Sequence, residues 1–152
     1  MKLKFIKPTK DHGELIATWK YSGEYSFYDN DKTESKREWS KNIDKEENTF
    51  VIYNENNELI GNCSFDYEDG EFMLGVQMKP AITGKGMGTE FVKEILDFGR
   101  KQYKFNKIEL LVAKFNKRAI KVYERQGFII TEEFMWHVNN EDKEFISMKR
   151  VW

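Results

Sequence analysis

The chain of 152 residues has few side chains that could cross-link it or hold a metal. It contains one cysteine, Cys63, and two histidines, His12 and His137, which lie far apart in the sequence. One thiol cannot form an internal disulfide, and so few ligands do not make a cysteine–histidine metal site. Cys63 has no histidine near it in the sequence, which argues against a thiol nucleophile. A lone cysteine is typical of a reducing compartment, so we expect a cytoplasmic protein.

The chain also lacks signs of linkers and of membrane association. It has two prolines, no tract rich in serine or glutamine, and no internal repeat. No apolar run approaches the roughly 20 residues that a membrane span needs. Residues 1–8 alternate charged and apolar side chains and lack the apolar stretch of a signal peptide. We therefore expect residues 1–152 to form a single domain around one core, with no membrane partner.

Net charge is also lacking, because the formal charge is only -1. This balance gives no indication of a nucleic-acid partner. The charges are nevertheless unevenly distributed: residues 29–71 hold 13 acidic and 5 basic residues, whereas residues 79–125 hold 12 basic and 5 acidic ones. The two halves could be solvated faces that complement each other. Alternatively, the basic half could meet an anionic cofactor and the acidic half a cationic acceptor.

Hydrophobic periodicity predicts antiparallel strands in the first half of the chain and alternating helices and strands in the second. The elements expected before Pro80 are a strand at 2–7, a helix capped by Thr9 or Asp11, a charged helix at 34–45, and strands at 50–53, 59–67 and 72–78. Those expected after it are a helix at 85–102, a buried strand at 108–113, a helix at 116–126, and strands at 128–138 and 144–148. This order predicts a mixed α+β sheet.

A glycine-rich loop joins the strand that ends near Met78 to the following helix. Gly84, Gly86 and Gly88 remove side chains where the backbone must approach a ligand closely. The loop N–H groups and the helix dipole favour an anion, and Lys85 adds a positive charge. A flexible turn is the alternative, but three alternating glycines weaken a helix start, so we favour an anion site. The segment fits neither the P-loop pattern nor the dinucleotide pattern.

Two segments resemble the signatures of the GNAT superfamily of acyl-CoA N-acyltransferases. The loop at 83–88, Thr-Gly-Lys-Gly-Met-Gly, matches the family's cofactor loop at both of its glycine positions, but Thr83 replaces the usual Arg or Gln. Residues 116–128 follow the family pattern N-x-x-A-x-x-x-Y-x-x-x-G-F. On these two segments the chain is identified as a member of this superfamily. The resemblance implies a mostly antiparallel sheet of six to seven strands flanked by about four helices.

The resemblance also implies acetyl-CoA as co-substrate and no metal. The glycine loop would bind the pyrophosphate, while strand backbone would bind the pantetheine arm and the acetyl carbonyl. Asn116 would hydrogen-bond the pantetheine arm, cap its helix, or do both. The residues that the resemblance assigns to the cofactor are Val76, Gln77, Met78, Thr83, Gly84, Lys85, Gly86, Met87, Gly88, Asn116 and Ala119.

The resemblance assigns two further residues to catalysis. Tyr123 would be the general acid that protonates the CoA thiolate, since a phenol is acidic enough for this transfer. The alternative for Tyr123 is a core tyrosine. Glu71 is the nearest candidate for a general base, although it adjoins a turn and could be solvated surface.

The acceptor would bind the aromatic segment at 19–29, which is similar to a pattern in uncharacterised bacterial members of the family. We expect Tyr21, Glu24, Tyr25 and Tyr28 to contact the substrate, because aromatic rings and carboxylates suit an amine on an apolar or sugar-like body. The same aromatics could instead pack a lid. The acceptor would be a small-molecule or peptide amine, with polyamine-like and aminoglycoside-like amines favoured by the acidic half.

The expected activity is acetyl transfer to a primary amine by direct attack in a ternary complex. One alternative is a catalytically silent acyl-CoA-binding module that senses or scaffolds, and another is a nucleotide-phosphate binder. The protein is expected to be a monomer or a homodimer.

Overall fold

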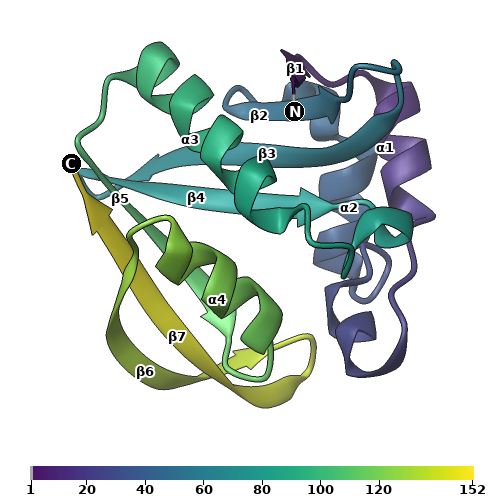
Figure 1. Ribbon diagram of the computed structural model, residues 1–152. Coiled ribbons are helices and arrows are strands. Elements are labelled where there is room, and N and C mark those ends of the chain that lie inside the picture. The colour runs from purple at the N-terminus through teal and green to yellow at the C-terminus, as the bar shows by residue number, and fades with distance from the viewer. Residues whose placement is uncertain (1) are drawn as a thin grey trace.

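A computed structural model describes residues 2–152 as one seven-stranded sheet with helices on both faces (Figure 1). The strand order is β1-β2-β3-β4-β5-β7-β6. The strands are β1 (Lys4–Ile6), β2 (Thr49–Tyr53), β3 (Leu59–Glu68), β4 (Glu71–Met78), β5 (Lys107–Ala113), β6 (Ile129–Val138) and β7 (Glu141–Val151). Every neighbouring pair is antiparallel except β4 and β5, which are parallel.

Four α-helices and three short 3-10 helices connect the strands. They are α1 (Lys10–Ala17), η1 (Gly23–Tyr28), α2 (Glu34–Lys41), η2 (Ile43–Lys45), η3 (Pro80–Ile82), α3 (Gly88–Tyr103) and α4 (Lys117–Arg125). The seven strands and four α-helices confirm the expected α+β class and its mostly antiparallel sheet. Among residues 2–152, no helix is long and apolar enough to cross a membrane.

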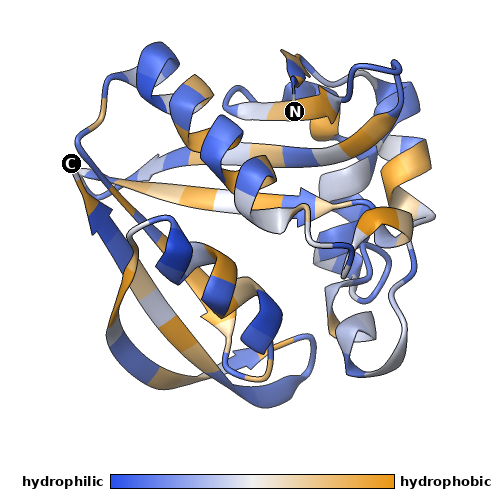
Figure 2. Cartoon of the chain, viewed as in Figure 1, coloured by the Kyte–Doolittle hydropathy of each residue, from blue (hydrophilic) through white to orange (hydrophobic). Residues whose placement is uncertain are grey.

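The α-helices cover two of the three clusters of the core, and η1 contributes Phe27 to the third. α3 and α4 cover one face of the sheet, where Phe91, Ile95 and Ile120 pack against the strands. α1 covers the opposite face, where Ile16 packs with Val51 of β2. Figure 2 shows apolar residues alternating with charged ones along α3 and α4, as expected of helices with one buried side. Helices therefore lie on both faces of the sheet at β1–β4, and α4 covers one face of the strands that follow them.

Thr9 begins α1 with a capping box. Its hydroxyl accepts a hydrogen bond from the backbone N–H of His12, and the His12 ring nitrogen Nδ1 accepts one from the backbone N–H of Thr9 at 2.9 Å. The other ring nitrogen of His12 lies 2.8 Å from the hydroxyl of Tyr53. His12 is therefore a structural residue that ties the start of α1 to β2.

Some predicted boundaries were wrong. α3 begins at Gly88 and not at residue 85, because Gly84 and Gly86 adopt φ angles of +71° and +77°, which are incompatible with a right-handed helix. The charged helix ends at Lys41, where Asn42 leaves helical geometry, and a separate 3-10 turn follows. The last strand is longer than predicted, since β7 pairs on both sides along most of its length.

Candidate active site

The parallel strands β4 and β5 share a single bridging pair, Met73 with Glu109, near the beginning of both strands. Beyond this pair the two strands diverge, as Figure 1 shows. On the other side of β4, the backbone N–H of Lys79 donates to the carbonyl of Ile60 at 2.8 Å, which continues the pairing with β3. The open edge of β4 is therefore the one that faces β5.

Backbone alternation decides which groups face this edge. In an antiparallel pair, alternate residues direct both their N–H and C=O toward the partner strand. Because Lys79 bonds to β3, Gln77 does so too, and the backbone groups of Val76 and Met78 face the opening. Of the three β4 residues predicted to contact the pantetheine arm, two present their backbones to the opening. The Gln77 backbone does not.

The glycine loop follows β4 directly and leads into α3. Met87 is the N-cap of α3 and makes no side-chain cap hydrogen bond. The first N–H groups of a helix have no partner within the helix, so they carry partial positive charge at this end. Lys85 is exposed in the loop. A backbone-lined, positively polarised end of a helix thus lies beside the open edge of β4 and can bind an anion.

Arg118 of α4 lies against this loop. A Cβ added to Gly84 would come within 2.8 Å of the Arg118 guanidinium. The guanidinium also stacks over the ring of Tyr25, 4.4 Å from its centroid. Sequence reasoning missed Arg118, although its place in the basic half and in the first turn of α4 was an available signal. It supplies a positive charge between the glycine loop and η1.

Asn116 is the N-cap of α4 and lies at the end of the β5–α4 connection. The Asn116 side-chain oxygen accepts from the backbone N–H of Ala119 at 3.2 Å, which caps the helix. Its side-chain nitrogen donates to the hydroxyl of Tyr28 at 3.3 Å. Ala119 packs against the main core, next to this cap. Asn116 thus caps α4 and at the same time joins it to η1.

Tyr123 follows in α4, and its ring is in edge contact with Phe128 at 5.8 Å. Burial raises the pKa of the Tyr123 hydroxyl, and the nearby Tyr28 raises it further. Within residues 2–152 this hydroxyl donates no hydrogen bond. A protonated phenol with a free O–H therefore lies on the same side of the site as Asn116 and Tyr28.

The aromatic segment forms η1 and packs its rings toward β4 and α4. The hydroxyl of Tyr21 donates to the carbonyl of Met78 at 2.6 Å. Tyr25 packs against Phe115 at 5.6 Å. Glu24 is exposed and forms no ion pair with any residue in 2–152. Tyr21 thus reaches the open edge of β4, whereas Tyr25 and Tyr28 contact the β5–α4 connection and the start of α4.

The model of the Acetyltransferase (GNAT) domain family matches residues 3–129. The chain belongs to the GNAT acetyltransferase family. An uncharacterized N-acetyltransferase, p20 of Bacillus licheniformis, is 32% identical over 81 residues, which cover 51% of this chain and 46% of p20. The chain therefore spans about half the length of this curated relative.

Two further matches cover most of the chain. The spermidine N(1)-acetyltransferase of Vibrio cholerae is 26% identical over 150 residues, covering 92% of this chain and 83% of that protein. A crystal structure of a spermidine N-acetyltransferase from Vibrio cholerae, in complex with CoA and spermine, superposes with a TM-score of 0.75 at 20% identity. That comparison covers 98% of this chain and 95% of the other, and it shows a shared fold.

Thr83, the position that departs from the GNAT loop pattern, lies inside the loop. Its hydroxyl donates to the carbonyl of Pro80 at 2.8 Å, and its backbone N–H donates to the same carbonyl at 3.2 Å. Thr83 therefore closes the 3-10 turn η3 that precedes the glycines. A short hydroxyl side chain therefore shapes this loop.

Glu71 is not brought together with the other predicted residues. It begins β4, whereas the open edge lies at the end of that strand. Its carboxylate pairs with Lys107 at 2.7 Å, and this hydrogen bond holds the pKa of Glu71 below its ordinary value. Glu71 is thus paired with a lysine and lies a strand's length from the open end of β4. It is too far from that end to act there as a general base.

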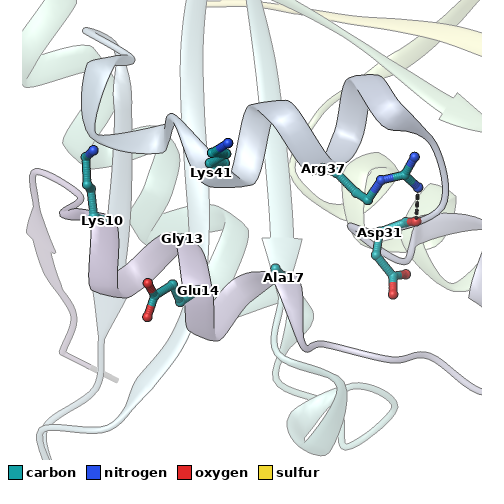
Figure 3. Close-up of a pocket in the computed structure, with 7 residues that line it drawn as sticks. All are labelled: Lys10, Gly13, Glu14, Ala17, Asp31, Arg37 and Lys41. Atoms are coloured by element: carbon teal, nitrogen blue, oxygen red, sulfur yellow. Dashed lines mark hydrogen bonds between the residues drawn. The ribbon is translucent and has the colours of Figure 1, made fainter.

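A separate hollow lies between α1 and α2 (Figure 3). It is lined by Lys10, Gly13, Glu14, Ala17, Asp31, Arg37 and Lys41. Arg37 donates to the backbone carbonyl of Asp31 at 3.0 Å across one end of it. None of the residues predicted for the GNAT site lines this hollow. Within residues 2–152, no group of three or more His, Cys, Asp or Glu side chains could hold a metal ion.

Proposed function

We propose that this protein is an N-acetyltransferase that moves the acetyl group of acetyl-CoA to the primary amine of a small molecule. One observation carries the proposal: the open edge of β4 has the uncapped start of α3 at its end and Asn116 with Tyr123 opposite. A thioester donor with an anionic tail fits this arrangement. The backbone N–H groups of the loop suit the anion, the strand edge suits the arm that follows it, and the phenol suits the leaving sulfur.

The glycine loop would bind the pyrophosphate of CoA. The N–H groups of Gly86 and Gly88 lie at the positively polarised end of α3, where a phosphate is stabilised. Arg118 and Lys85 add positive charge beside them. The pantetheine arm would then extend along β4 and pair with the backbone of Val76 and Met78 as an added strand would.

The amine would attack the thioester carbonyl directly, so that a C–N bond forms and the C–S bond breaks. A backbone N–H on the open edge of β4 stabilises the charge on the carbonyl oxygen. Tyr123 donates its proton to the departing sulfur, which avoids release of a free thiolate. The amine loses one proton to water, and Tyr123 regains one, so the products are an amide and CoA thiol.

The acceptor would lie against η1, where Tyr25 and Tyr28 provide aromatic surface. Relatives that are named spermidine acetyltransferases support a small polyamine-like amine. Glu24 is free to attract a second positive charge on such a molecule. We also place the protein in the cytoplasm, a proposal that rests on its single, buried and reduced Cys63.

Measuring CoA release from acetyl-CoA over a panel of amines tests the activity and the acceptor together. The panel should contain spermidine, spermine, an aminoglycoside, free amino acids and a peptide with a free N-terminus, and mass spectrometry should identify the acetylated product. We expect turnover with the small polyamines. CoA binding by calorimetry without turnover on any amine would contradict the proposal and indicate a silent acyl-CoA-binding module.

A further inference from the structure

Two buried asparagines fix the side chain of Gln77. The amide nitrogens of Asn30 and Asn62 each donate to the Gln77 side-chain oxygen at 3.0 Å. Asn30 is 7% exposed and Asn62 is 5% exposed, so water does not compete for these bonds. The Asn30 nitrogen also donates to the carbonyl of Ile16 at 3.1 Å, which anchors it to α1. With its oxygen held by two donors, the Gln77 amide has a single orientation.

This orientation determines what Tyr21 does. The Gln77 amide nitrogen carries only donors, and the Gln77 side chain lies close enough to the Tyr21 hydroxyl to lower its pKa against the larger, opposite effect of burial. The Tyr21 hydroxyl therefore finds no acceptor in the Gln77 amide nitrogen, and it donates its proton to the carbonyl of Met78, 2.6 Å away. Burial raises the pKa of Tyr21, so this proton is retained. The backbone N–H of Tyr21 is held by Asp29 at 2.9 Å, which keeps the residue in place.

The hydrogen bond from Tyr21 thus ends at a backbone carbonyl on the open edge of β4. A carbonyl oxygen has two lone pairs, and Tyr21 occupies one of them. The second remains available to an N–H donor in the opening.

We infer that Tyr21 and Gln77 are positioning residues that hold the Met78 carbonyl to receive an amide N–H of the pantetheine arm. This role rests on the proposed use of acetyl-CoA. It also differs from the sequence expectation that Tyr21 contacts the acceptor. The pair acts on binding of the cofactor, because the bond to Met78 is present before and after the chemical step, and interactions of that kind change KM without changing kcat.

A competing acceptor for the Tyr21 proton separates this role from packing. In Gln77→Glu, the new carboxylate keeps the size of the side chain but has no donor for Tyr21. The Tyr21 hydroxyl would then donate to the carboxylate, which is a stronger acceptor than the Met78 carbonyl. Gln77→Glu should therefore remove the hydrogen bond to the Met78 carbonyl, as Tyr21→Phe does. The double variant should lose no more CoA affinity than either single variant.

The experiment measures the CoA dissociation constant by calorimetry and acetyl-CoA kinetics for the wild type, Tyr21→Phe, Gln77→Glu and the double variant. Tyr53→Phe is the matched control, because it removes a tyrosine hydroxyl bond of similar length, to His12 at 2.8 Å, away from the site. We expect CoA affinity to fall about fivefold in both single variants and in the double variant. The KM for acetyl-CoA should rise equally, with kcat within about twofold of wild type.

Unchanged affinity in both single variants, tighter binding in Tyr21→Phe, or independent effects that multiply in the double variant would each overturn the inference. A fivefold loss in the Tyr53→Phe control would do the same, since it would point to general destabilisation. If the wild type binds CoA but acetylates no amine, the proposed activity fails while the affinity comparison still decides the role of Tyr21. A wild type that does not bind CoA would overturn both.

Discussion

The side-chain amide of Asn116 donates a hydrogen bond to the hydroxyl of Tyr28 across 3.3 Å. The same side chain caps α4 through its oxygen. One residue therefore sets the start of the helix that carries Tyr123 and also ties that helix to η1. The two roles that the sequence left open, a cap and a polar contact in the site, use different atoms of the side chain and are compatible.

Replacing Asn116 with serine separates these roles. Serine is a good N-cap, but its side chain is too short to reach Tyr28. We expect Asn116→Ser to unfold in urea close to the wild type while its turnover falls. Asn116→Ala should lose both functions, with about 1 kcal/mol less stability. Full activity in the serine variant would show that only the cap matters.

Tyr123→Phe removes the phenol proposed as the proton donor and keeps the ring that packs against Phe128. We expect kcat to fall by about 100-fold, within the range of a lost general acid. The dissociation constant of CoA should stay within about twofold, because the hydroxyl acts on the leaving sulfur and not on binding. Stopped-flow CoA release and calorimetry measure the two quantities, and an unchanged kcat would remove this role from Tyr123.

The pH dependence follows from the direction of the Tyr123 pKa shift. Burial raises this pKa above the ordinary value of about 10, so the protonated acid persists to higher pH than in a free tyrosine. The corresponding contribution to stability is complete below about pH 10 and is lost as pH rises toward the folded-state pKa. We expect no decline in kcat from this group at or below about pH 10. A decline there that disappears in Tyr123→Phe would contradict this.

Gly86→Ala tests whether the loop backbone approaches a ligand. Gly70, in the β3–β4 turn, is a matched control: its φ of +82° resembles the +77° of Gly86, and an added Cβ at either position meets nothing within 4 Å. Alanine should therefore cost both variants about 1 kcal/mol of stability through backbone strain alone. CoA affinity should fall by about tenfold or more in Gly86→Ala only. Equal CoA binding in the two variants would argue against a pyrophosphate at this loop.

Much of the fold was predictable because its signals are local. The alternation in β3 and β4, the apolar run of β5 and the Asn116 cap each depend on neighbouring residues, and the strands and helices lie where these signals placed them. The start of α3 was not predicted correctly. Periodicity alone places residues 85–87 in the helix, and only the positive φ angles of Gly84 and Gly86 exclude them.

The site was less predictable because its contacts join distant segments. Glu71 was suggested by its place on β4, but distance along a strand separates it from the open end, and its partner Lys107 comes from β5. The bond from Tyr21 to Met78 spans 57 residues and has no local signature. Sequence patterns named the aromatic segment as the acceptor region, but the partner of each hydroxyl comes from a distant segment and has no local pattern.

Arg118 provides the sharpest test of the charge at the cofactor loop. Its guanidinium lies beside Gly84 and is stacked on Tyr25, so we expect Arg118→Gln to weaken CoA binding about tenfold and to make the remaining affinity less sensitive to salt. Arg125→Gln makes the same charge change at the other end of α4 and is exposed, so it should change CoA affinity little. Arg118→Lys keeps the charge but loses the planar stack and should fall between the two. Calorimetric titration of CoA at low and high salt measures the affinity of all three variants. Equal losses of CoA affinity in Arg118→Gln and Arg125→Gln would mean that only the net charge of α4 matters.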